Sequence, residues 1–250
     1  MLDSWLRLPG AAPAYWHLKW KARPGKRPGS GAQNAVLQTR AEWEAAVTEA
    51  RSLGLPLHQD PPKNWDSLVA LRAILEHTTP AARVLDAGAA TYSAILPWLA
   101  AYGYRDLVGI NLVFQKPLRV GPIVYEHGDI TKTGYPDGSF AAITSLSVIE
   151  HNVDVSAFLR EAARLLAPGG VLVVSTDYFD PAIDTGGAVA YGGPVKVFCA
   201  ADLKRLLDEA RGLGLVPTSE PIDVSCAEKC VTWSRFGLAF TFVVLTLQKQ

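Results

Sequence analysis

From residue 83 onward, short apolar runs alternate with longer segments in which apolar residues recur every three or four positions. Runs of the first kind are typical of buried strands, and segments of the second kind are typical of helices that cover a sheet. The pattern predicts strands at residues 83–86, 106–111, 123–125, 140–144, 171–175, 215–217 and 236–247, and helices at residues 94–102, 155–166 and 201–213. Repeated strand–helix units favour a parallel, doubly wound α/β sheet whose ligand lies outside the carboxyl ends of the strands.

Two more helices are expected before this sheet. Apolar residues at helical spacing predict one helix over residues 41–53. The double proline at residues 61–62 excludes a helix there, and Asn64 or Asp66 is expected to cap a second helix that runs to His77.

Charge is unevenly distributed along the chain, although the formal net charge is zero. Residues 1–40 hold seven Lys and Arg side chains and one acid, so the rest is mildly acidic, which argues against a large nucleic-acid interface. Residues 1–35 form either a basic arm for an anionic partner or a solvated tail that packs Trp16 or Trp20 on the body, and so short a basic run favours the tail. The basic cluster consists of Lys19, Lys21, Arg23, Lys26 and Arg27.

The remaining composition places the chain among intracellular globular proteins. Its three cysteines, Cys199, Cys226 and Cys230, are too few for a disulfide framework, and they lack the spacing of a zinc site. The most apolar run, residues 236–247, is too short to cross a bilayer, and the N-terminus lacks the pattern of a signal peptide. We therefore expect a cytoplasmic protein without a metal site or a membrane segment.

The strongest chemical signal is the sequence Val-Leu-Asp-Ala-Gly-Ala-Ala at residues 84–90, between the first strand and the first helix of the sheet. Gly88 and the small residues beside it let the backbone approach a ligand closely. The carboxylate of Asp86 would repel a pyrophosphate, but it suits a ligand that carries an ammonium and a sulfonium group. Asp86 and the missing acid at Asn111 therefore disfavour a nicotinamide-linked oxidoreductase.

Further motifs follow in a fixed order: Gly128-Asp129-Ile130, then Phe140 to Ser145, then Glu150-His151, and finally Ala167-Pro168-Gly169-Gly170. Together with residues 84–90, they resemble the motifs of the class I S-adenosylmethionine (SAM) dependent methyltransferases, in particular the small-molecule, type 11-like branch. The resemblance covers about residues 80–250. It implies a Rossmann-like methyltransferase fold, a mostly parallel seven-stranded sheet with an antiparallel last strand. The chain departs from the family where Ala90 and Tyr92 replace glycines and Ala141 replaces an aspartate.

The same resemblance implies where SAM binds. Asp86 and the following turn would surround the methionine portion, while Asp129 accepts from the adenine amine and Ile130 packs on the ring. Asn111 replaces the family's acid at the ribose, where its amide can accept one hydroxyl hydrogen and donate to another oxygen, with weaker binding than a carboxylate gives. The expected cofactor-binding residues are Asp86, Ala87, Gly88, Ala89, Ala90, Asn111, Leu112, Asp129, Ile130, Ser145 and Leu146.

A hydroxyl acceptor would also need a base. His151, just after the fourth strand, is the best-placed titratable residue for that role, and the alternative is that it forms a structural pair with Glu150. In this fold the segment before the first strand often covers the pocket, so Lys63 could pair with the SAM carboxylate and Trp65 could line the site. The alternative for these two is a surface lysine and a core tryptophan.

A long insertion at about residues 176–198 contains further candidates for substrate contact, Tyr178 and Tyr191. Its acids, Asp177, Asp180 and Asp184, could suggest Mg²⁺, but acids at loop spacing are more often solvated.

These features define two regions and two hypotheses. Residues 1–78 form an N-terminal arm and helices that cover the cofactor pocket, and residues 79–250 form the SAM-binding methyltransferase domain. The first hypothesis is methyl transfer from SAM to an oxygen or nitrogen atom of a small polar metabolite or a sugar-like acceptor. The second is a non-catalytic binding module with weakened cofactor affinity. The sequence leaves the acceptor and the oligomeric state open.

Overall fold

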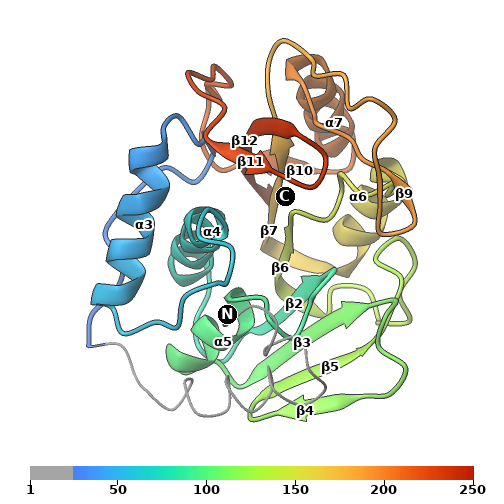
Figure 1. Cartoon of the computed structure of the whole chain (residues 1–250). Helices are drawn as coiled ribbons and strands as arrows, with labels where there is room; N and C mark the ends of the chain where they lie inside the picture. Colours follow the sequence, from blue (N-terminus) through green and yellow to red (C-terminus); the bar gives the residue numbers. More distant parts are fainter. Residues whose placement is uncertain (1–24) are drawn as a thin grey trace.

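The computed structural model describes residues 25–250 (Figure 1). Lys19, Lys21 and Arg23 of the basic cluster, with Trp16 and Trp20, lie outside the described residues. The helices are α3 (Arg40–Ser52), α4 (Lys63–His77), α5 (Ile95–Ala101), α6 (Val155–Leu165) and α7 (Ala200–Gly212). The strands are β1 (Ala35–Val36), β2 (Arg83–Ala87), β3 (Asp106–Asn111), β4 (Leu118–Val120), β5 (Ile123–His127), β6 (Phe140–Leu146), β7 (Leu166–Tyr178), β8 (Val189–Ala190), β9 (Gly193–Pro194), β10 (Leu215–Pro217), β11 (Val231–Trp233) and β12 (Leu238–Lys249).

One large sheet forms the centre of the described structure, in the order β1-β12-β7-β6-β2-β3-β5-β4, with β10 and β11 also paired to β12. The strands from β7 through β6, β2 and β3 to β5 are parallel, and β12 is antiparallel to β7. This arrangement confirms the predicted doubly wound sheet with an antiparallel last strand. The seven predicted strands all form. The short strands β1, β4 and β11 join them, so the sheet has ten strands rather than seven.

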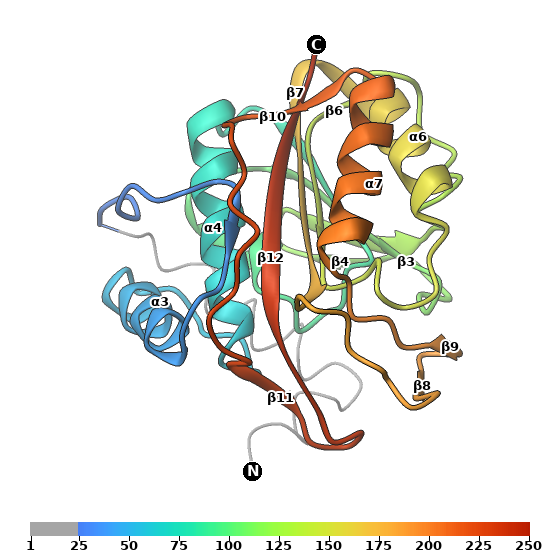
Figure 2. The ribbon, with the colours of Figure 1, turned by 90° about the horizontal axis from the view of Figure 1, so that it is seen from above.

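Helices cover both faces of this sheet, with α3 and α4 on one side and α6 and α7 on the other (Figure 2). The side chains of β7 explain the two layers. Val171 and Val173 pack into the core under α3, α4 and α5, whereas Leu172 and Val174 pack into the core under α6 and α7. Because successive side chains of a strand point to opposite faces, a strand that is buried on both faces must be apolar throughout.

The start of α4 differs from the sequence prediction, because neither Asn64 nor Asp66 caps it. The helix begins at Lys63 after Pro62, and its first backbone N–H groups donate to the carbonyl oxygens of Asp60 and Pro61, each at 3.1 Å. The loop before the helix thus closes the first turn by itself. Asn64 lies inside the helix and accepts from the backbone of the loop, while the Asp66 side chain is free to point toward the sheet.

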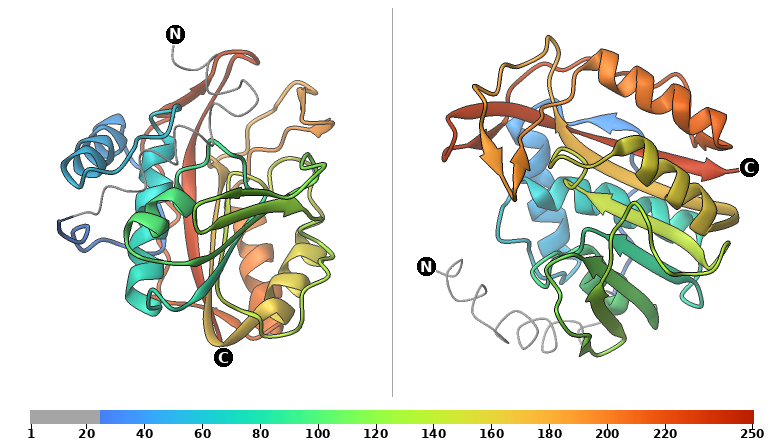
Figure 3. Two further views of the ribbon diagram at one scale, coloured as in Figure 1. Left: turned by 90° about the horizontal axis from the view of Figure 1, so that it is seen from below. Right: turned by 90° about the vertical axis from the view of Figure 1, so that its right-hand side faces the viewer.

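The insertion begins later than predicted, because β7 extends through Tyr178 and so includes Thr176 and Asp177. Beyond it, β8 and β9 form a hairpin at the end of the molecule where the parallel strands have their carboxyl ends (Figure 3). The backbone ties this hairpin region to the segment after β6, since Lys196 N donates to Glu150 O at 3.1 Å and Val195 forms a bridge with His151. Residues 150–151 and the insertion therefore form one surface.

None of the helices formed by residues 25–250 combines the length and the apolar composition that a membrane crossing requires.

Candidate active site

The turn after β2 brings Asp86 and Gly88 to the carboxyl end of the sheet. Gly88 has a φ of 94°, and a Cβ there would lie 2.5 Å from Cγ2 of Val148, so a side chain cannot be accommodated. Asp86 is 3% exposed and accepts a hydrogen bond of 2.7 Å from Oγ1 of Thr144. Burial raises the pKa of Asp86 to about 7, although the bond from Thr144 opposes the shift. Asp86 is therefore a buried carboxyl group that a positively charged ligand would stabilise.

Asn111, at the end of β3, ties the same turn to the sheet. Its Nδ2 donates to the carbonyl oxygens of Gly88 at 3.2 Å and Ala89 at 3.0 Å, and its Oδ1 accepts from Val113 N at 3.2 Å. Both N–H groups of the amide are thus engaged, so the expected donation to a ribose oxygen does not fit this conformation. Oδ1 keeps a second lone pair that can accept from a hydroxyl group.

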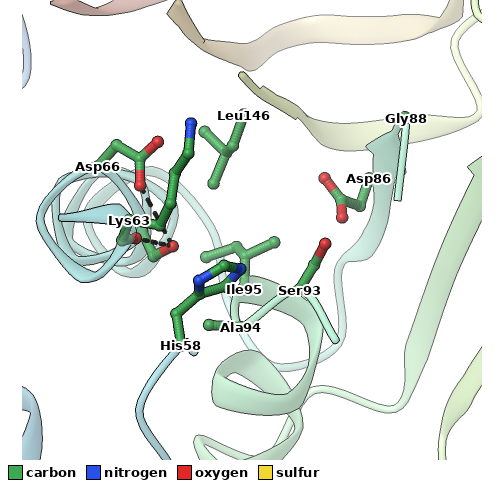
Figure 4. Close-up of a pocket in the computed structure, with 10 residues that line it drawn as sticks. His58, Lys63, Asp66, Asp86, Gly88, Ser93, Ala94, Ile95 and Leu146 are labelled. Carbon is green, nitrogen blue, oxygen red and sulfur yellow. Dashed lines mark hydrogen bonds between the residues drawn. The ribbon is translucent and has the colours of Figure 1, made fainter. Parts of the chain in front are cut away.

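A small pocket, partly open to solvent, lies between this turn and the start of α4. Figure 4 shows Asp86 and Gly88 on one side of it and Lys63 and Asp66 on the other. The lining residues are His58, Lys63, Asp66, Ser67, Asp86, Gly88, Ser93, Ala94, Ile95 and Leu146. The structure thus brings together four residues that the sequence predicted for cofactor or substrate binding, namely Lys63, Asp86, Gly88 and Leu146.

Lys63 is the cation of this region. Its Nζ donates to Oγ of Ser147 and lies 4.1 Å from the ring centroid of Phe242, an arrangement that stabilises an ammonium group. Burial alone would lower the pKa of the Lys63 ammonium, but the attraction of nearby carboxylates raises it above its ordinary value. These carboxylates belong, in decreasing order of effect, to Asp177, Asp66, Glu150 and Asp60. Lys63 is therefore protonated at neutral pH.

Three of these carboxylates, Asp66, Glu150 and Asp177, are almost completely buried. Asp66 Oδ2 accepts from Ser175 Oγ at 2.7 Å, and Glu150 Oε2 accepts from Thr176 Oγ1 at 3.1 Å. Burial raises the pKa of Asp177 to about 7, and burial together with the charge of Asp177 raises the pKa of Glu150 to about 8. Asp177 is therefore not the solvated loop acid that the sequence predicted, because it belongs to the end of β7.

His151, the expected base, lies beside Glu150, with its Nε2 4.0 Å from Glu150 Oε1. Burial, and then the charge of Lys63, lower the pKa of His151 to about 4, so the imidazole is neutral at neutral pH and binds a proton weakly. Among the described residues, neither Oε1 of Glu150 nor Nδ1 of His151 has a hydrogen-bond partner. The pKa of Glu150 lies near neutrality, so Glu150 can take up or release a proton there, whereas the imidazole of His151 stays neutral.

Aromatic side chains from the insertion and from β11 surround His151. The ring centroid of Tyr191 lies 4.7 Å from that of His151, and the ring centroid of Trp233 lies 6.0 Å from it. Phe236 supports Trp233, with centroids 4.6 Å apart. Tyr191 is 77% exposed, so this aromatic group, defined here as His151, Tyr191 and Trp233, reaches the surface.

The residues expected at the ribose and the adenine lie at the adjacent strand ends. Leu112 is exposed directly after β3. Asp129 is exposed after β5, and its Oδ1 accepts from the backbone N–H of Thr131 at 2.8 Å and from the Thr131 hydroxyl at 2.7 Å. Ile130 is half-buried and packs against the core under α6 and α7. Their roles in cofactor binding stay predictions.

Other candidates do not line the pocket. Trp65 is buried, in agreement with the alternative of a core tryptophan. Tyr178 is fully buried, and its hydroxyl donates to Val224 O at 2.7 Å, so the structure does not bring it to a substrate. Ala87 and Ala89 are buried around the turn, and Ala90 is half-buried with its N–H donating to Ser93 Oγ. Ser145 is fully buried in β6.

The sequence reasoning missed Asp66, His58 and Ser93 as pocket residues. The signal for Asp66 was present, because it lies one helical turn after Lys63 and so shares its face of α4. His58 lies in a loop whose course no periodicity reveals. Residues 25–250 contain no group of three or more His, Cys, Asp or Glu side chains arranged to hold a metal ion.

Comparisons with known proteins identify the class. The family described as "Methyltransferase domain" matches residues 57–218, which is well over half of the chain. The chain therefore belongs to this methyltransferase family. Among solved structures, it resembles 1,6-didemethyltoxoflavin-N1-methyltransferase of Burkholderia thailandensis, determined with 1,6-didemethyltoxoflavin and S-adenosylhomocysteine (SAH). The TM-score is 0.55 at 19% identity, over 92% of this chain and all of that one, which supports the fold.

Two relatives match over shorter stretches. A probable S-adenosylmethionine-dependent methyltransferase of Mycolicibacterium smegmatis is 40% identical over 62 residues, which are 24% of each chain. Demethylmenaquinone methyltransferase of Mycolicibacterium gilvum is 37% identical over 98 residues, which are 38% of this chain and 42% of the relative. The chain thus matches well under half the length of these relatives.

The residues of the pocket fit SAM. Asp86 is buried without a cation among the groups that shift its pKa, so it would gain from the ammonium and sulfonium charges of the cofactor. Lys63, across the pocket, supplies the opposite charge for the cofactor carboxylate. Gly88 keeps the turn narrow enough for the backbone to form one wall.

Proposed function

We propose that the protein transfers the methyl group of SAM to an oxygen or nitrogen atom of a small polar acceptor. The observation that carries the proposal is the pocket between Asp86 and Lys63, whose opposite charges match the amino-acid portion of SAM. The solved Burkholderia enzyme is named for 1,6-didemethyltoxoflavin, and the Mycolicibacterium gilvum relative is named for demethylmenaquinone. Both favour a small-molecule acceptor. A cytoplasmic location and the absence of a nucleic-acid partner remain predictions from the sequence.

When bound, SAM supplies a methyl group on a sulfonium centre, which is already a good leaving group. The task of the protein is then to align the acceptor and to exclude water. Asp86 and Lys63 hold the donor by its charges, and Leu146 provides an apolar wall at the end of β6. The segment after β6 is the part of the chain that would face the acceptor, since it carries Glu150 and His151 above the strand ends.

The test is calorimetric titration of the protein with SAH. We expect binding with a dissociation constant in the micromolar range, and Asp86→Asn is expected to weaken it by at least tenfold because the buried negative charge is lost. Asp184→Asn removes an exposed carboxylate of the insertion and serves as the matched control, with unchanged affinity. An affinity of Asp86→Asn equal to that of the wild type contradicts the proposal.

A further inference from the structure

A group of buried acidic side chains adjoins the donor pocket, and its carboxyl groups outnumber the ammonium group that they face. Within residues 25–250, the buried carboxyl groups of Asp66, Glu150 and Asp177 face one ammonium group, that of Lys63. A buried carboxylate without a cation or hydrogen bonds is costly, because water no longer solvates it. This part of the site therefore favours a second cation.

Glu150 is the carboxyl group with which such a cation would pair. The residue is 1% exposed, and its Oε1 has no hydrogen-bond partner among the described residues. The charged groups that act on it are Asp177 from β7 and Lys63 from α4, and Asp66 in turn interacts with Lys63. Nε2 of the neutral His151 lies 4.0 Å from Glu150 Oε1. Because the pKa of Glu150 is raised to about 8, its carboxyl group holds a proton at pH 7 in the absence of a bound cation.

The aromatic group defined above stands next to this carboxyl group. Aromatic faces attract cations, and the neutral imidazole of His151 adds no repulsion. The backbone of Tyr191 is strained, since its φ of 51° is unfavourable for a residue with a side chain. Its hairpin contacts the neighbouring loop closely, because a Cβ on Gly193 would lie 2.3 Å from Cβ of Asn152.

From these observations we propose that the acceptor is an alkylamine, cationic at neutral pH, whose ammonium group pairs with Glu150 beside the rings of His151, Tyr191 and Trp233. The inference rests on the proposed methyl transfer and selects nitrogen over oxygen as the methylated atom. It also gives the insertion a role, since the hairpin supplies Tyr191.

The proton balance of the reaction follows. Binding of the ammonium group displaces the proton of Glu150 to solvent. The bound nitrogen then passes its N–H proton to Glu150 Oε1, and its freed lone pair forms the bond to the methyl carbon while the electrons of the carbon–sulfur bond go to sulfur. The products are the methylated ammonium ion and SAH, and Glu150 has regained its proton. One proton is released for each methyl group transferred.

The experiment is calorimetry on the SAH-saturated protein at pH 7 with N,N-dimethylethanolamine. The control ligand is 3-methyl-1-butanol, which has the same shape with carbon in place of nitrogen. We expect the amine to bind at least tenfold more tightly than the alcohol. Titrations in phosphate and in Tris buffer, which differ in ionisation enthalpy, should reveal the release of close to one proton for each amine bound.

Glu150→Gln is expected to weaken amine binding by at least tenfold and to abolish the proton release, whereas Glu228→Gln, an exposed carboxylate near β11, should change neither. If Glu150→Gln does not fold, Tyr191→Ala at the exposed rim should weaken amine binding severalfold and retain the proton release. Equal affinities for amine and alcohol, no amine binding, or proton release that persists in Glu150→Gln would each overturn the inference.

Failure of SAH to bind would count against the proposed function instead. The amine titration is then carried out on the protein alone, where the same contrast between amine and alcohol is expected.

Discussion

Asn111 Nδ2 donates to the carbonyl oxygen of Gly88 at 3.2 Å, so the residue at the end of β3 holds the turn at the end of β2. A second bond from the same amide reaches Ala89 O. A carboxylate at this position could donate neither bond and would repel both carbonyl oxygens. The departure of this chain from the family's acid therefore has a structural reason.

Asn111→Asp is consequently expected to weaken SAH binding about tenfold and to lower the melting temperature, since the loss of the two hydrogen bonds from this half-buried amide costs about 1–3 kcal/mol. Calorimetry and thermal unfolding measure the two effects. Asn111→Ala removes the bonds without adding repulsion and should fall between the wild type and Asn111→Asp. An increase in the affinity of Asn111→Asp for SAH would instead mean that a carboxylate at position 111 gains more by binding the ribose hydroxyl groups than it loses at the turn.

Gly88→Ala should be among the most destabilising single-methyl changes in the chain. The new Cβ would meet Val148 at 2.5 Å and would occupy a φ of 94°. Gly187→Ala is the matched control, since its φ is also positive, at 70°, with no atom within 4 Å of the added carbon. We expect the control to cost about 1 kcal/mol of unfolding free energy from backbone strain alone, and Gly88→Ala to cost several kcal/mol.

Adding Val148→Ala to Gly88→Ala separates the two causes. The double variant should regain the part of the stability that the collision removed and keep the part that the backbone strain removed, as chemical denaturation measures it. If Gly88→Ala and Gly187→Ala are equally stable, the close approach to Val148 is not a constraint.

Stability is expected to fall between pH 6.5 and 8. Asp86 and Asp177 have pKa values raised to about 7 and Glu150 to about 8, so the folded protein holds protons that the unfolded chain has already released. The stabilisation by these protons is complete below the unfolded pKa values and is lost as pH rises through the folded ones. Over this range we expect a loss of about 2–3 kcal/mol, most of it from Glu150.

Below pH 6.5 the histidines act in the opposite direction. His58 and His151 have pKa values lowered to about 4, so the unfolded chain binds protons there that the folded protein does not. Two histidines do not outweigh three carboxyl groups, so stability should keep rising, more gradually than the carboxyl groups alone would give, as pH falls from 6.5 toward about 5. Urea denaturation at half-unit intervals of pH would measure this slope. Glu150→Gln should flatten the fall above pH 6.5, and an unchanged slope in that variant would contradict the assignment.

The Tyr191→Gly variant distinguishes a role of Tyr191 in the stability of the fold from a role in acceptor binding. Glycine adopts the φ of 51° without strain, so the melting temperature should be unchanged or higher, while binding of an amine acceptor weakens severalfold. Thermal unfolding and amine titration are measured on the same preparation. A melting temperature several degrees lower would show that Tyr191 is held there for the stability of the fold.

The order of the sheet and the position of the donor pocket could be predicted from the sequence because each depends on local pattern. Apolar runs mark the parallel strands, and Asp86 with Gly88 marks the turn at their carboxyl ends. The short strands β1 and β4 could not be predicted, since two or three residues carry no periodicity.

The charges beside the pocket could not be predicted for a different reason. The bond from Ser175 to Asp66 joins residues 109 positions apart, and it exists only because α4 packs across the end of β7. Asp177 was misassigned because β7 continues past the point where its uniformly apolar pattern stops. Polar residues at the end of a buried strand resemble a loop in the sequence, although they form part of the core.

The attachment of the insertion also bears on how the protein can diversify. Its hairpin is held to residues 150–152 by backbone contacts and by the close approach of Gly193 to Asn152, none of which depends on the side chain at position 191. Exchanging that side chain alters the rim of the acceptor site without disturbing the sheet or the turn at Gly88. In a lineage of such enzymes, new acceptors can therefore arise by changes at this tip while methyl donation is inherited intact.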